Sequence, residues 1–309
     1  MKAAAITATA LAFALGTSVA SPARAEPPVT DAPAAAPAAH ETTQAQRDLD
    51  RPPLGLFPTP RDALIDPTMA RDWAAFPSRL FVATTVDVGY VYARPRVTLG
   101  YGKPFTTFVG LDVNPIATNT GLGLYGGLRG AVPYLDLRVG ARQFWAFSHT
   151  YLPPAESYQR IDLETRGDAR ARYLTWEAEM DASIPLGPGQ VVLRGSASYV
   201  TGVPEGQYVF EETLHVIVAP PLVWRVRGGY ALGFGPRQQH SIGLVVDVLD
   251  IPKRDDSVTL RVGPILRFVL SRRVDVRGSF VATAVSPDRI GLVGGDFTEL
   301  GVRYRWASE

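Results

Sequence analysis

Acidic side chains stand at alternate positions between residues 171 and 184. Glu177, Glu179 and Asp181 are two residues apart, so a strand would place all three carboxylates on one face. Carboxylates arranged in this way can serve as a general acid and base or hold a cation. The two neighbouring segments carry arginines at the matching parity, namely Arg138, Arg142 and Arg194. Because opposite charges on adjacent strands pair readily, we interpret these acids as members of ion pairs.

A basic set follows in the last third of the chain. Its members are Arg225, Arg227, Arg261, Arg267, Arg277, Arg303 and Arg305. Asp247 and Asp275 stand at the same parity, and the cations outnumber them. Two interpretations remain open. Either the charges neutralise one another and fill a closed interior, or the arginines line a narrow water-filled pore and attract anions.

Other residue types indicate no catalytic or metal centre. The chain has four histidines and no cysteine, which excludes disulfides, thiolate chemistry and zinc sites built from cysteine. Ser148 and His149 are adjacent, so a strand points them to opposite faces and they cannot act as a dyad. We expect no enzymatic activity, no cofactor and no bound metal.

The elements that position these charges are strands. From Leu80 onward, β-branched and aromatic residues alternate with polar ones between turns that contain Gly and Pro. Twelve segments fit this pattern: 80–92, 96–102, 105–113, 121–131, 134–148, 171–184, 190–201, 222–234, 240–249, 257–270, 274–284 and 296–306. The pattern predicts an all-β fold of antiparallel strands.

The last of these segments carries a distinctive combination of a polar residue, a glycine and two aromatics two apart. Its members are Glu299, Gly301, Tyr304 and Trp306. This resembles the C-terminal signal by which bacterial outer-membrane β-barrel proteins are recognised by their insertion machinery. That pattern normally ends on the aromatic residue, whereas this chain continues with Ala307, Ser308 and Glu309. The resemblance implies a transmembrane antiparallel up-and-down β-barrel of about 12 strands, inserted in the outer membrane with the help of periplasmic chaperones and the insertion machinery.

Two further features agree with a barrel in a lipid bilayer. Short turns alternate with mostly longer loops, and an even number of strands returns both termini to the periplasm. Aromatic residues gather toward both ends of the apolar face, as membrane interfaces select, whereas apolar alternation alone also fits a soluble sandwich. The outer group is Tyr90, Tyr92, Trp145, Phe147, Tyr199 and Trp224, and the inner group is Tyr101, Phe105, Phe234, Phe268, Tyr304 and Trp306.

The chain before the barrel divides into three parts. Residues 1–25 combine Lys2, an apolar stretch and Ala23-Arg24-Ala25, which predicts a cleaved secretory signal peptide. Residues 26–60 are rich in Pro and Ala and predict a disordered periplasmic linker. Residues 61–79 predict a short periplasmic or barrel-mouth segment, and residues 80–309 the barrel. Cleavage leaves 29 basic against 30 acidic residues, which does not favour nucleic acid as a partner.

We therefore expect a narrow passive channel whose Arg-rich lumen favours small anionic solutes. The arginine pattern is similar to the arginine tracks of twelve-stranded porins for acidic oligosaccharides. The alternative is a closed barrel with an ion-paired lumen that serves a structural role or binds partners through its loops. The loop at residues 202–221 is itself strand-like, and it either extends outward as a hairpin or folds inward over the pore.

Overall fold

The structure is a computed structural model that describes residues 77–163, 170–235, 238–271, 273–291 and 300–308. The predicted signal peptide, the linker, most of the segment at 61–79, and Glu299 lie outside the described residues. No helix in the described part of the chain is long and apolar enough to cross a membrane.

Twelve strand positions make up the barrel. Their bounds are β1 Arg79–Gly89, β2 Tyr92–Lys103, β3 Thr107–Thr118, β4 Gly121–Val132, β5 Leu135–Thr150, β6 Arg170–Leu186, β7 Gly189–Thr201, β10 Leu222–Phe234, β11 His240–Asp250, β12 Thr259–Val269, the interrupted pair β13 Val274–Ser279 and β14 Ala282–Val285, and β15 Leu300–Ala307. Two short strands, β8 (Val209–Glu211) and β9 (Val216–Val218), form a separate hairpin, and η1 (Arg160–Leu163) is a turn of 3-10 helix.

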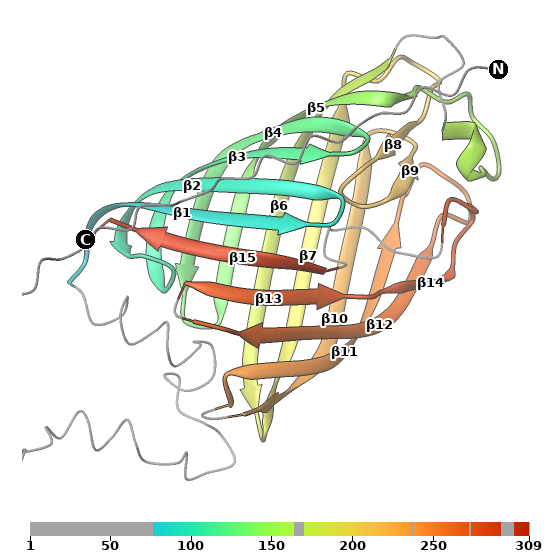
Figure 1. Cartoon of the computed structure of the whole chain (residues 1–309). Coiled ribbons are helices and arrows are strands. Elements are labelled where there is room, and N and C mark those ends of the chain that lie inside the picture. Colours follow the sequence, from blue (N-terminus) through green and yellow to red (C-terminus); the bar gives the residue numbers. More distant parts are fainter. Residues whose placement is uncertain (1–76, 164–169, 236–237, 272, 292–299, 309) are drawn as a thin grey trace, which may run out of the picture. The chain divides into compact units, whose positions relative to one another are not determined.

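Every barrel strand pairs antiparallel with its neighbours, and β15 closes the ring against β1 (Figure 1). Strands β13 and β14 both pair with β12 and together occupy one position in the ring. The predicted twelve-stranded antiparallel barrel is therefore confirmed. Closure pairs the backbone groups of the first and last strands, which would otherwise be exposed at an edge.

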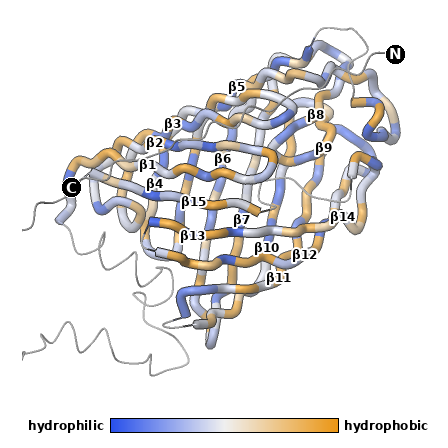
Figure 2. Tube along the Cα trace, in the orientation of Figure 1, coloured by the Kyte–Doolittle hydropathy of each residue, from blue (hydrophilic) through white to orange (hydrophobic). Residues whose placement is uncertain are grey.

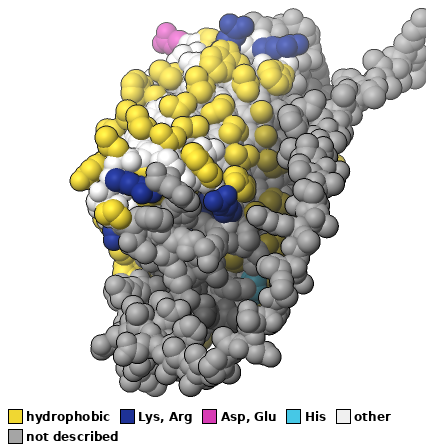
Figure 3. All heavy atoms as spheres, turned by 60° about the vertical axis from the view of Figure 1, so that its left-hand side comes forward, with side chains coloured by type: hydrophobic (Ala, Val, Ile, Leu, Met, Phe, Trp, Pro, Cys, Tyr) yellow, Lys and Arg dark blue, Asp and Glu magenta, His cyan; other side chains and the backbone are white. Residues whose placement is uncertain are grey.

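The two faces of the barrel wall differ in chemistry, as strand alternation requires. Figure 2 shows polar and apolar positions alternating along the strands. Side chains on the outer face are apolar and exposed, for example Leu99, Val109 and Leu128. Figure 3 shows apolar side chains gathered on one side of the barrel, with Lys and Arg side chains above and below them. Charged residues such as Asp112, Arg142 and Arg225 are buried on the inner face.

Two predicted strand ends were misplaced because prolines were taken as boundaries. Pro95 and Pro115 lie inside β2 and β3, where the pairing of these two strands is interrupted between Ala93 and Val97. Their other neighbours hold the segments in place, since β2 continues along β1 and β3 continues along β4. The connections on this side are consequently short, at residues 90–91 and 119–120.

Two aromatic residues assigned to the lipid belts lie elsewhere. The ring of Tyr92 covers Gly89 and Gly301 on the inner face, where a Cβ at either glycine would collide with it. Phe105 sits in the turn between β2 and β3 with φ 61° and packs on the buried cluster around Phe81. Glycine on the lumen face thus makes room here for an aromatic ring.

The last strand extends past the expected aromatic terminus. Tyr304 and Trp306 point outward, each 39% exposed, while Ala307 is buried in the cluster at the short-turn end. Ser308 continues the contact with β1, because its backbone N donates to Val82 O at 2.8 Å and its carbonyl accepts from Arg79 Nη2 at 2.9 Å. Ala307 and Ser308 therefore take part in barrel closure.

Candidate pore lining and the hairpin that crosses it

The acids of β6 each contact an arginine on an adjacent strand. Glu177 accepts from Arg142 Nη2 at 2.9 Å, and Glu179 pairs with Arg138, both on β5. Asp181 pairs with Arg194 of β7, at a more exposed position near the short turns. Pairs of this kind balance the charge of this wall, which has as many acids as bases among these six residues.

The basic set lies on the facing strands β10–β15, with three of its arginines around Asp247. Arg227 and Arg261 stand directly opposite Asp247 in the cross-strand register. Arg225 Nε, Arg227 Nη2 and Arg261 Nη1 lie 2.5, 3.3 and 3.8 Å from the carboxylate oxygens. The Asp247 side chain is fully buried, so one desolvated carboxylate serves three guanidinium groups.

The other four arginines share two carboxylates. Arg277 Nε, Arg305 Nη1 and Arg267 Nη2 lie 2.6, 3.0 and 3.2 Å from Asp275. The fourth, Arg303, reaches across the closing seam and donates to Asp87 Oδ2 at 2.8 Å. Among the described residues, seven arginines of this basic wall therefore lie around three acids, and five of the seven have further interactions beyond these contacts.

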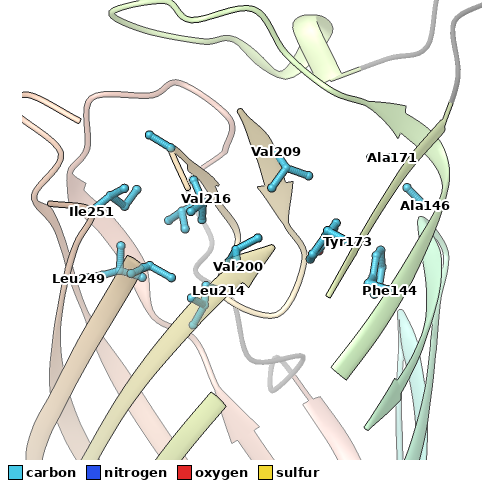
Figure 4. Close-up of a cluster of buried hydrophobic side chains, with 13 residues drawn as sticks. Phe144, Ala146, Ala171, Tyr173, Val200, Val209, Leu214, Val216, Leu249 and Ile251 are labelled. Carbon is cyan, nitrogen blue, oxygen red and sulfur yellow. The ribbon is translucent and has the colours of Figure 1, made fainter. Parts of the chain in front are cut away.

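The β8–β9 hairpin lies inside the long-loop end of the barrel. Val209, Ile217 and Val218 are completely buried. Figure 4 shows hairpin side chains between Phe144 and Tyr173 on one side and Leu249 and Ile251 on the other. Of the two arrangements that the sequence left open for the loop at residues 202–221, the structure has the inward fold.

Polar contacts tie the hairpin to two distant parts of the wall. Glu211 Oε1 lies 2.9 Å from Arg142 Nη1 of β5. Arg261 of β12 donates to the carbonyl oxygens of Leu214 and His215 at 2.9 and 3.1 Å. Because β5 and β12 are five positions apart in a ring of twelve strands, the hairpin crosses the lumen.

A second layer of loops covers the hairpin. Arg254 forms a bidentate pair with Asp288, at 2.6 Å to each oxygen, and donates to the carbonyls of Ile217 and Glu156. Apolar contacts among two loops and the hairpin complete this layer, through Leu152, Tyr158, Leu163, Phe210, Ile217 and Ile290. Loops that are distant in sequence thus hold the hairpin from outside.

In the ranges that the structure describes, no three His, Asp or Glu side chains are grouped to hold a metal ion. His149 and His215 pack their rings on Phe210 at centroid distances of 5.0 and 5.2 Å. These contacts place both histidines beside the hairpin, within the mouth of the barrel.

Sequence patterns missed the acids of the hairpin. Glu211 and Glu212 stand in a mostly apolar stretch, Tyr208 to Val218, and this contrast was the available signal. Acids in a solvent-exposed loop need no partner, whereas acids in an apolar hairpin that is buried do. Arg254 and Asp288 lie in separate loops, where no periodic pattern relates them.

Comparison with known proteins gives little beyond this geometry. No protein-family model matches the chain, and no curated protein sequence matches it. Among solved structures, a NanC porin matches 74% of this chain and 98% of its own, at 8% identity and a TM-score of 0.34. The fold assignment rests on the strand register and not on this similarity. A closed barrel of twelve antiparallel strands with an apolar outer face and a charged interior is the architecture of a bacterial outer-membrane β-barrel protein.

Proposed function

We propose that the chain is a narrow passive channel of the bacterial outer membrane that favours small anionic solutes. The signal peptide at residues 1–25 directs export, and the C-terminal pattern directs insertion through periplasmic chaperones and the barrel-insertion machinery. Neither catalysis nor a cofactor is part of the proposal. The bilayer and the permeating anions are its other partners.

The observation that carries the proposal is the unequal charge of the basic wall. In the part of the chain that the structure describes, seven arginines contact Asp247, Asp275 and Asp87, whereas the three acids of β6 pair with three arginines. Charges that line a confined pore act on a passing ion more strongly than charges on an open surface, because less water screens them. The basic wall therefore favours anions over cations.

The hairpin sets the width of the proposed path. It crosses the lumen between Arg142 and Arg261, so any solute must pass beside it or displace it. Wide, weakly selective conductance does not fit this arrangement, whereas small conductance and strong charge selection do. This distinguishes the proposed channel from a general diffusion pore.

Charge neutralisation on the basic wall tests the proposal. Changing Arg227, Arg277 and Arg305 together to Gln leaves Arg225 and Arg261 with Asp247, Arg267 with Asp275, and Arg303 with Asp87. The substitution removes three positive charges and leaves Asp247, Asp275 and Asp87 each with at least one arginine. In planar bilayers, the variant should lose most of the anion preference of the unmodified protein.

A matched variant separates lumen charge from total charge. Arg170, Arg172 and Arg289 are exposed at the long-loop end, so changing all three to Gln removes the same charge outside the lumen. This control should keep the anion preference. Equal loss in both variants would contradict the proposal, since it would mean that surface charge sets the selectivity.

The second candidate is a closed barrel with a structural role. It is favoured by the burial of the hairpin and its two-sided anchoring. The same bilayer experiment decides between the two functions: folded protein that gives no conductance steps under any applied voltage supports the closed barrel and rejects the channel.

A further inference from the structure

The turn of the hairpin carries two titratable side chains of opposite kind. Glu212 is 6% exposed, and His215 follows three residues later with its ring against Phe210. Neither group belongs to the basic wall. Both move from the barrel interior to water if the hairpin leaves the lumen.

Glu212 is surrounded by groups from three strands and a turn. His149 Nδ1 of β5 lies 3.9 Å from its carboxylate, and the Thr120 side chain hydrogen-bonds to it. Its backbone N donates to Tyr173 Oη of β6 at 3.4 Å. Arg142 and Glu211 also act on it electrostatically, but they already form an ion pair with each other.

His215 is surrounded by groups of positive or neutral character. Arg261 of β12 donates to its carbonyl oxygen, while Arg160 of η1 and His149 face it from the loop and from β5. A positive charge on the His215 ring is therefore disfavoured in the packed hairpin. The neutral imidazole is the form that packs.

The two groups respond to pH in opposite directions. Burial, together with Glu211, raises the pKa of Glu212 to about 7 from its ordinary 4.5. The Glu212 carboxyl therefore stabilises the packed hairpin fully below pH 4.5, and this stabilisation is lost as the pH rises to about 7. Burial and the Arg261 charge lower the pKa of His215 to about 4 from 6.5. The His215 side chain therefore stabilises the packed hairpin fully above pH 6.5, and this stabilisation is lost as the pH falls to about 4. The two losses cover the same range of pH.

We propose that Glu212 and His215 form a compensating pair that keeps the hairpin packed in the lumen from acid to neutral pH, so that removing either group makes release of the hairpin pH-dependent, in opposite directions. This device is separate from anion selection. It concerns the position of the hairpin and holds for an open or a closed barrel.

A single buried cysteine reports hairpin release without any need for conduction. Val216 is 4% exposed and apolar, and the chain has no native cysteine, so Val216→Cys places one thiol in the packed hairpin. Its rate of reaction with maleimide, divided by that of exposed Glu205→Cys at the same pH, measures release and cancels the pH dependence of the thiol. Purified barrels in liposomes, compared between pH 5.0 and 7.5, give the required range.

Each variant has its own expected profile. The parent protein should change by less than about threefold over this range. Glu212→Gln should release the hairpin about 20-fold more at pH 5.0 than at pH 7.5, and His215→Asn should do the reverse by a similar or larger factor. Asn suits this site because His215 has φ 56°, a left-handed conformation that Asn tolerates. The labelling ratio of the double variant should again change little with pH.

The series distinguishes compensation from simple damage. A misfolded variant would react rapidly at every pH, whereas the double variant should regain the flat profile of the parent. Repeating the series with His149→Asn removes the third titratable group near Glu212 and should preserve both directions. Flat profiles in both single variants, or a parent profile that changes more than about tenfold, would overturn the proposal.

Discussion

Arg142 and Glu211 form the contact that ties the hairpin to β5, with Nη1 and Oε1 2.9 Å apart and side-chain exposures of 2% and 0%. Glu211 also accepts from the backbone N of Leu214 at 2.8 Å, so the same carboxylate shapes the hairpin turn and anchors it. A buried carboxylate of this kind depends on its cationic partner. Arg142 is therefore one of the arginines of the barrel wall that hold the hairpin in position.

Arg142→Met is expected to release the hairpin. Removing one member of a buried ion pair costs about 3–5 kcal/mol, because the other charge remains desolvated without compensation. The labelling rate of Val216→Cys should rise by at least about tenfold, as half this cost already corresponds to that factor. Arg194→Met is the matched control: its partner Asp181 is 35% exposed, and a pair in contact with water contributes about 1 kcal/mol or less. Equal labelling in the two variants would contradict the anchoring role.

Asp275→Asn is expected to lower the thermal stability of the barrel and to increase anion preference. Arg267, Arg277 and Arg305 all lie within 3.2 Å of Asp275, so the amide leaves three guanidinium groups without their shared negative charge. Heat-modified gel mobility measures the first effect and bilayer recordings the second. Asp181→Asn serves as the control, and an Asp275 variant that is no less stable than this control would count against the role of Asp275.

Deleting Ala307 to Glu309 is expected to impair assembly of the barrel. Ala307 is buried, and Ser308 exchanges hydrogen bonds with Val82 and Arg79 at the seam between β15 and β1. Replacing Tyr304 and Trp306 with Ser should also reduce assembly, through loss of the outward aromatic pair. The fraction of folded, heat-modifiable protein in membranes measures both. Full assembly of the tail deletion would show that closure does not need these residues.

Cysteine labelling on intact cells tests the orientation of the barrel. Pro154 and Arg289 are exposed in long loops, and Pro188 is exposed in the short turn between β6 and β7. Long loops face outward in outer-membrane barrels, so the first two positions should react with an impermeant maleimide and the third should react only after lysis. If only Pro188→Cys reacted on intact cells, the barrel would have the opposite orientation in the membrane.

Alternation of apolar and polar residues was enough to predict the strands, whereas their closed arrangement was inferred from the C-terminal pattern, the loop lengths and the aromatic residues at both ends of the apolar face. It failed locally at Pro95 and Pro115, because proline was taken to end a strand. Proline removes one backbone donor, but β1 and β4 supply pairing on the other edge of these strands. Parity also assigned Tyr92 to the lipid face, whereas its ring lies over Gly89 and Gly301 inside the barrel.

The contacts of the pore lining were also predictable only in part, because parity assigns a residue to a face and does not give its neighbours. Parity placed Arg227, Asp247 and Arg261 on one face, but the register that sets them side by side follows from turn geometry and bulges, which the sequence pattern does not contain. The inward hairpin depends on contacts with Arg142 and Arg261, which are more than forty residues away from it in either direction. Such long-range contacts leave no periodic signal.

The reversal potential of single channels in a gradient of KCl at low salt tests the central claim most directly. Screening is weak at low ionic strength, so the positive charge of the basic wall should act at full strength there. The account predicts small discrete conductance steps whose reversal potential lies close to the equilibrium potential of chloride. A reversal potential close to that of potassium would contradict it.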